Sequence, residues 1–223
     1  MFTDTILAPA GSPEPSGPAA RGRPGRGTWR QYLAAVRVLL ALTVVLGLAY
    51  PLGVTGVAQL PGLRDKATGS PVRNASGQVI GSRLLGQGFL DTGGWPLREW
   101  FQPRPSAASS GASNLGPSNP NLVRAIGDRR AAIAAFDSLP GRRVDPDQVP
   151  ADAVTSSGSG LDPDISPAYA RQQAYRVAAA RRLDASALLA LVEDQVQGRD
   201  LGFLGEPRVN VLELNLAVER LRP

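Results

Sequence analysis

The longest apolar stretch of the chain runs from Val38 to Leu63 and contains no Asp, Glu, Lys or Arg among its 26 residues. As an α-helix it would extend about 39 Å, compared with about 30 Å for the hydrocarbon core of a bilayer. We therefore predict one membrane-spanning helix over residues 29–63. Pro51 and the glycines at 47, 53 and 56 predict a kink or a close approach by a neighbouring helix, or reflect only the greater frequency of Gly and Pro in membrane helices.

Beyond the apolar stretch, the pattern predicts short strands separated by turns. Residues 71–73 and 78–85 flank an Asn-Ala-Ser-Gly turn and predict a hairpin. Another short strand is expected at 153–156. The intervening residues 86–119 are rich in Gly, Ser, Pro and Asn, which indicates a long loop that is either functional or disordered.

Amphipathic spacing predicts four helices in the same region, each preceded by a capping residue. The expected caps are Asn119 or Ser118, Ser166, Asp184 and Asn210. Gly198 is expected to end the third of these helices in the left-handed conformation. The fold class is therefore α+β: an N-terminal transmembrane helix followed by a single domain of helices and short strands at 64–223.

Residues 1–28 are rich in Pro, Gly, Ser, Ala and Arg, which predicts a disordered tail. Five arginines lie close before the apolar stretch, whereas three basic residues follow it, and this bias favours a cytoplasmic tail and an extracytoplasmic domain. The two groups are Arg21, Arg23, Arg26, Arg30 and Arg37, and Arg64, Lys66 and Arg73. A cleaved signal peptide ending near Gly56 and Ala58 is the alternative, but its apolar core would typically be only about 7–15 residues long.

Composition excludes most familiar catalytic schemes, because the chain has no Cys and no His. Thiol nucleophiles, thiolate or imidazole metal ligands and His-based triads are absent. The net charge of +5 is concentrated before the apolar stretch, and no basic stripe interleaved with aromatic residues indicates nucleic-acid binding. The part of the chain after the apolar stretch is nearly neutral.

Two Gly/Ser/Asn-rich segments, 104–120 and 154–170, contain candidate chemistry. Each leads into a predicted helix and could present backbone N–H groups to a phosphate, but turns and helix caps explain the same composition. Asp162 and Asp164, with Asp152 nearby in sequence, could form an oxygen-rich cation site or ordinary Asp-Pro turns. A nucleophilic serine has no histidine to activate it.

Several motifs occur in a characteristic order: YPLGVTGVAQ, GQVIGSRLLGQ, RPSA, SNLGPSNP, SGSGLDPDISP and LGFLGEPRVNVLELN. On these motifs, the chain from Arg37 to Leu221 resembles the C subunit of the Kdp potassium-transporting ATPase, a bacterial potassium importer. It departs from the family in its tail at 1–28, in the segment 93–102, and at Asp164, where many members have histidine.

The resemblance implies a non-catalytic subunit of the cell membrane with three partners: a channel-like potassium-binding subunit, a P-type ATP-hydrolysing subunit and a small helical subunit. No cofactor or metal is expected to bind firmly to this chain, since ATP and K⁺ are handled by the complex. A DKTGT-like phosphorylation loop is absent from the sequence. The subunit is expected to stabilise assembly.

The resemblance also points to loops that contact partners or carry function. The candidate residues are Arg104, Ser110, Asn114, Asn119, Gly158, Asp162, Asp164 and Glu206. Two alternatives remain open at this stage. One is a catalytic chaperone that raises the ATP affinity of the pump subunit, and the other is a signal-anchored extracellular enzyme.

Overall fold

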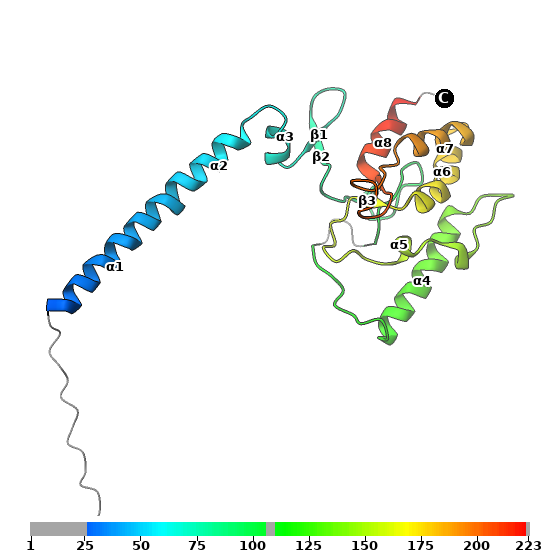
Figure 1. Ribbon diagram of the computed structural model, residues 1–223. Helices are drawn as coiled ribbons and strands as arrows, with labels where there is room; N and C mark the ends of the chain where they lie inside the picture. The colour runs from blue at the N-terminus through cyan, green and yellow to red at the C-terminus, as the bar shows by residue number, and fades with distance from the viewer. Residues whose placement is uncertain (1–25, 106–109, 222–223) are drawn as a thin grey trace, which may run out of the picture. The chain divides into compact units, whose positions relative to one another are not determined.

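A computed structural model describes residues 26–105 and 110–221 (Figure 1). The chain divides into two units, Met1–Ala58 and Gln59–Pro223. We describe each unit by itself. Residues 1–25 of the predicted tail lie outside the described residues. Mixed helices and short strands confirm the α+β class.

The first unit is a single helical rod built from α1 (Arg26–Val44), the π-helical segment η1 (Val45–Ala49) and α2 (Tyr50–Ala58). Among the described residues it is the one helix that is long and apolar enough to cross a membrane. The rod begins before the predicted 29 and ends at Ala58 rather than at 63, because residues 59–63 form turns instead of continuing the helix.

A π-helical turn lies immediately before Pro51. The Tyr50 N–H donates to the carbonyl of Val45, five residues back. Proline has no N–H to continue the normal pattern, and its ring crowds the preceding turn. The wider turn accommodates this mismatch, so the helix contains a π-bulge just before Pro51.

The second unit begins with α3 (Arg64–Ala67) and the predicted hairpin, formed by β1 (Pro71–Arg73) and β2 (Val79–Ser82). The strands pair antiparallel, with a bulge between Val72 and Arg73. Asn74 closes the turn, because its Oδ1 accepts from the backbone N–H groups of Ser76 and Gln78 at 3.2 and 2.9 Å. The hairpin prediction is confirmed.

Four longer helices and a second two-stranded pair make up the rest of the second unit (Figure 1). In chain order the elements are α4 (Pro120–Asp137), the 3₁₀ turn η2 (Pro146–Gln148), α5 (Ala151–Val154), β3 (Asp164–Ile165), α6 (Pro167–Arg181), α7 (Ala185–Asp194), β4 (Val209–Asn210) and α8 (Val211–Arg220). Strands β3 and β4 pair antiparallel. The buried core lies between α6, α7 and α8, with Tyr169, Leu188 and Leu214 among its largest residues.

Each predicted cap holds the first turn of its helix through a side-chain oxygen. Asn119 accepts from Asn121 N–H, Ser166 from Tyr169, Asp184 from Ser186 and Asn210 from Glu213. The alternative cap Ser118 is not used. Because these contacts span only two or three residues, local sequence is sufficient to predict them.

Two local predictions are wrong. The strand expected at 153–156 is instead the short helix α5, whose Ala153 and Val154 are buried in the core. Gly198 does not end α7, which stops at Asp194 with Gln195 in the right-handed conformation. Burial of Ala153 and Val154 favours the first difference, and in the second the chain has already left the helix to pair Gln197 with Arg208.

Candidate functional site

The site is built around the loop that joins α5 to α6, residues 155–166, which we call the hub loop. Its own side chains fold it into consecutive turns. Ser157 Oγ accepts from Gly160 N–H at 2.9 Å, and Ser159 Oγ accepts from Leu161 N–H at 3.1 Å. The hub loop therefore has a defined shape despite its Gly/Ser composition.

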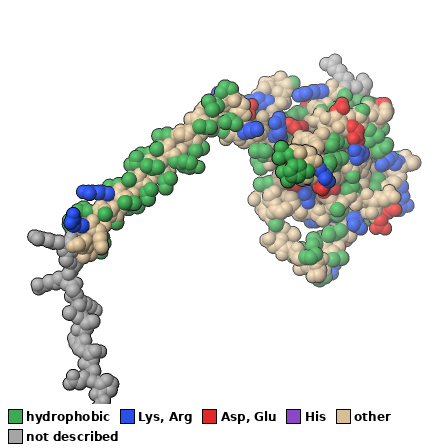
Figure 2. Space-filling model, viewed as in Figure 1, with side chains coloured by type: hydrophobic (Ala, Val, Ile, Leu, Met, Phe, Trp, Pro, Cys, Tyr) green, Lys and Arg blue, Asp and Glu red, His purple; other side chains and the backbone are tan. Residues whose placement is uncertain are grey.

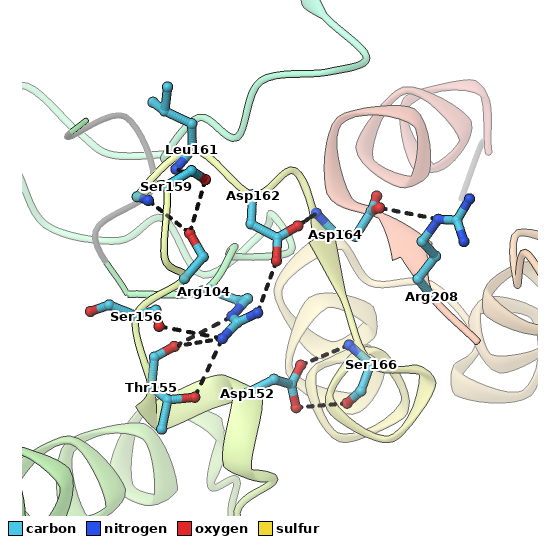
Figure 3. Close-up of polar contacts among 12 residues, drawn as sticks. Arg104, Asp152, Thr155, Ser156, Ser159, Leu161, Asp162, Asp164, Ser166 and Arg208 are labelled. Carbon is cyan, nitrogen blue, oxygen red and sulfur yellow. Dashed lines mark hydrogen bonds and ion pairs between the residues drawn. The ribbon is translucent and has the colours of Figure 1, made fainter. Parts of the chain in front are cut away.

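Arg104, which lies before α4 in the chain, binds the hub loop through its side chain (Figure 3). Its Nη1 donates to Asp162 Oδ2 at 2.8 Å, while Nε and Nη2 each donate to the carbonyl of Thr155 at 3.3 Å. The side chains of Arg104 and Asp162 are 23% and 30% exposed. One guanidinium thus ties Thr155, at the start of the loop, to Asp162 farther along it through charge-assisted hydrogen bonds.

Asp152 fixes the far end of the hub loop, where α6 begins (Figure 3). Its two carboxylate oxygens accept from the backbone N–H and the hydroxyl of Ser166 at 2.7 and 2.8 Å. The Ser166 hydroxyl in turn caps α6. The helix N-terminus is therefore satisfied by the protein's own side chains, which accounts for the composition without a bound phosphate.

Asp164 connects the hub loop to β4. Its carboxylate lies 3.3 Å from Arg208 Nε and accepts from Asn210 Nδ2 at 3.2 Å. Burial raises the pKa of Asp164 above its usual range, and the nearby charge of Asp162 adds to this, while Arg208 opposes it. The carboxylate at the position expected to hold histidine is thus engaged in an ion pair within the domain.

Backbone contacts bring two further segments to the hub loop. Gly86 N–H donates to Leu161 O at 2.8 Å, and Gly111 N–H donates to Ser159 O at 2.9 Å. A Cβ on Gly86 would lie 2.4 Å from the carbonyl oxygen of Asp162, so only glycine fits this approach. Segments from four of the motifs that occur in order along the sequence therefore meet in one place, together with the backbone of Gly111.

The structure separates the predicted candidate residues into two groups. The first group belongs to the hub loop or binds it. Gly158, Asp162 and Asp164 lie in the loop, and Arg104 binds Asp162. The others lie outside that loop: Asn119 caps α4, Glu206 pairs with Arg199, Asn114 is exposed, and Ser110 is exposed next to Gly111, which contacts the loop. Partner contact at any of these residues remains a prediction.

The carboxylates of the hub do not converge on a common point, because Asp152, Asp162 and Asp164 each face a different partner (Figure 3). Within the described ranges, no group of three or more acidic residues is placed to hold a metal ion. The arrangement joins segments to one another, and its charges are used in doing so.

Sequence reasoning missed a second polar cluster, in the core. Arg176 has no exposed side-chain surface and donates from Nε to Asp137 Oδ1 at 2.7 Å. Its other nitrogens donate to the carbonyls of Arg98 and Trp100 and to Gln173 Oε1. Burial lowers the pKa of Arg176, which the charge of Asp137 opposes.

Beside this cluster, two side-chain amides bind the backbone of Phe101 and Gln102 as a neighbouring strand would. Phe101 exchanges two hydrogen bonds with the Asn215 amide, at 2.8 and 3.0 Å, and Gln102 does so with Gln173, at 2.7 and 3.0 Å. This segment lies within the region that looks atypical in sequence. The available signal was that Gln173 and Arg176 share a helix face with Tyr169 and Val177.

The fold and the site together define a protein with one candidate membrane helix and an α+β domain whose motifs are tied into a single loop cluster. The family model described as "KdpC: K+-transporting ATPase, c chain" matches residues 32–220. The chain belongs to this family.

Curated relatives agree along nearly their whole length. A potassium-transporting ATPase KdpC subunit of Kineococcus radiotolerans is 50% identical over 201 residues, covering 87% of this chain and 95% of the relative. The protein of that name in Streptomyces coelicolor is 47% identical over 217 residues, covering 86% and 93%. That of Mycobacterium tuberculosis H37Rv is 47% identical over 199 residues, covering 86% and 99%.

Proposed function

We propose that the chain is a non-catalytic subunit of a potassium-transporting ATPase and stabilises the assembly of its ion-conducting and ATP-hydrolysing subunits. ATP hydrolysis and potassium binding would then reside in the partners. The observation that carries the proposal is the internal use of the hub charges: Arg104 and Asp162 bind each other, and Asp164 binds Arg208. A catalytic site would instead present such groups to a substrate.

We further propose that the domain at 64–223 lies outside the cytoplasm, as the excess of arginines before the helix favours. Cysteine labelling tests this directly, because the chain has no native Cys. Ser110→Cys places a thiol at an exposed position, and Ser16→Cys serves as the control in the tail. We expect an impermeant thiol reagent to label Ser110→Cys in intact cells and Ser16→Cys only after lysis.

The opposite labelling pattern would overturn the proposal that the domain lies outside the cytoplasm. It would favour the alternative, a chaperone that raises the pump's affinity for ATP. Assembly is tested separately by deletion. Without this chain, we expect the remaining subunits to lose stable association and potassium uptake to fail. If they assembled normally and only the KM for ATP rose, the assembly role would be wrong.

A further inference from the structure

The connection between α7 and β4 is a narrow hairpin held at two levels. At its base, Gln197 and Arg208 exchange backbone hydrogen bonds of 2.8 and 3.0 Å. Nearer its end, Asp200 and Leu204 exchange two more, each 2.9 Å long. We call residues 199–206 the apolar tip. These hydrogen bonds hold the backbone of the tip without a contribution from any partner.

The apolar tip presents hydrophobic side chains to solvent. Leu201, Phe203 and Leu204 are 83%, 69% and 49% exposed. In Figure 2, a knot of hydrophobic side chains stands on the viewer's face of the folded domain, where Figure 1 draws this connection. Such a cluster has a hydration cost that only burial against another surface would remove.

Leu201 also adopts a backbone conformation that leucine rarely takes, with a φ of 55°. The left-handed region brings Cβ close to the following carbonyl and is disfavoured for residues other than Gly, Asn and Asp. A glycine would relieve this strain, and Gly202 beside it has φ 83°. A strained, exposed leucine therefore indicates that its side chain is needed at this place.

Charged residues flank the exposed apolar residues along the hairpin, and together we call them the charged rim. Arg199 pairs with Glu206 at 2.8 Å, and Asp200 lies 3.5 Å from Arg208. Two basic and two acidic groups give no net charge, whereas loops that bind anionic lipid carry an excess of basic residues. An apolar centre with a balanced polar rim is the pattern of a protein–protein contact.

We propose that the apolar tip inserts Leu201 and Phe203 into an apolar pocket of a partner subunit of the potassium-transporting ATPase. The charged rim then pairs with polar groups around that pocket. This inference rests on the proposed function, because it takes the partner to be a subunit of that complex. Preorganisation of the hairpin lowers the conformational cost of docking. The two side chains then act as the main anchors of the contact.

The test uses the full chain, affinity-tagged and co-expressed with the other subunits of its ATPase. The variant Leu201→Gly/Phe203→Ser removes both anchors while suiting the positive φ at 201. We expect its affinity for the partner to fall by at least about 30-fold, because the loss of a single strong anchor already has an effect of that size. The control Trp95→Ser/Val123→Ser removes two side chains that are 73% and 59% exposed, and should retain the partner normally.

The possible results separate the two proposals. If the wild-type chain retains no transport subunits, the proposed function fails. If the wild type retains them and Leu201→Gly/Phe203→Ser retains them equally, the docking inference fails while the proposed function stands. Circular dichroism and thermal melting of the purified variant establish that its domain is folded.

A second measurement identifies what covers the tip. Phe203→Cys, labelled with an environment-sensitive fluorophore, should show a blue-shifted emission only in the assembled complex. A shift for the chain alone in nanodiscs of neutral lipid would assign the tip to the bilayer. A shift for the chain alone that grows with its concentration would assign it to a second copy. Either of these results would overturn the inference.

Discussion

Arg104 and Arg176 each bind one carboxylate and backbone carbonyls from a distant segment, yet their surroundings differ. Arg176 and its partner Asp137 are 0% and 1% exposed, whereas Arg104 and Asp162 are 23% and 30% exposed. Arg176 organises the core around residues 98–102. Arg104 organises the hub loop near the surface.

The comparison shows that identical chemistry has different energetic consequences at different depths. A buried charge that loses its partner has no water to replace it, so breaking a buried pair costs about 3–5 kcal/mol. A partly exposed pair is screened by solvent and its loss is largely compensated. Arg176 should therefore determine whether the domain folds, and Arg104 how its loops are arranged.

Arg176→Met should have the largest effect. It leaves Asp137 buried without its cation and frees the carbonyls of Arg98 and Trp100. We expect the free energy of unfolding to fall by about 3–5 kcal/mol. Urea denaturation of the full chain, followed by tryptophan fluorescence, measures the change.

The double variant Arg176→Met/Asp137→Leu is the matched control for that prediction. Removing both charges should recover part of the loss, because no unpaired ion remains. Recovery should be incomplete, since the carbonyls of residues 98 and 100 still lack donors. A double variant no more stable than Arg176→Met would contradict the assignment of the effect to a buried charge.

Arg104→Gln should have a smaller effect, lowering the free energy of unfolding by about 1–2 kcal/mol. It removes the charged bond to Asp162 and weakens the contact with Thr155. Arg104→Lys keeps the charge without the planar array of donors, so it should lie between the wild type and Arg104→Gln. If both variants were as destabilising as Arg176→Met, depth would not be the deciding difference.

Asp164→Asn should have the smallest effect, and it should depend on pH. Because the folded pKa of Asp164 is raised, its contribution to stability is present below about 3.8 and is lost as pH rises through the folded value. The variant lacks this titration. The free energy of unfolding of Asp164→Asn minus that of the wild type should therefore increase as the pH rises through the folded pKa. The increase should be less than about 1 kcal/mol, after allowance for the lost pair with Arg208.

Urea titrations of both proteins at several pH values from 3 to 7 would measure that difference. A difference that fell as pH rose would mean that the ion pair with Arg208 outweighs the burial of Asp164. The conclusion that a partly exposed ion pair contributes little to stability would then not hold in the hub loop.

Local chemistry was predictable from the sequence where a contact spans a few residues. The caps at Ser166 and Asn210 and the turn at Asn74 follow from side-chain oxygens within four positions of the N–H groups they accept. The long apolar helix followed from the absence of charge. The π-helical turn before Pro51 was not predicted, although proline's missing N–H and crowded ring account for it.

Contacts between distant residues were not predictable in this way. Arg104 and Asp162 were both candidates, but they are 58 positions apart and nothing local pairs them. Asn210 and Glu213 have capping-box spacing, yet the Glu213 carboxylate binds Arg83 instead of returning to the cap. Residues 98–102 are held by side-chain amides from α6 and α8, a form of pairing without a strand pattern.

The central claim is that the contacts of the hub loop hold the domain together and take no direct part in ATP turnover. Turnover of the assembled ATPase carrying Arg104→Gln tests this claim most directly. The amount of complex and its potassium-stimulated ATP hydrolysis are measured in the same preparation, over a range of ATP concentrations. We predict less complex, with kcat and the KM for ATP per assembled complex unchanged. Normal assembly with a severalfold change in the KM for ATP would contradict the account.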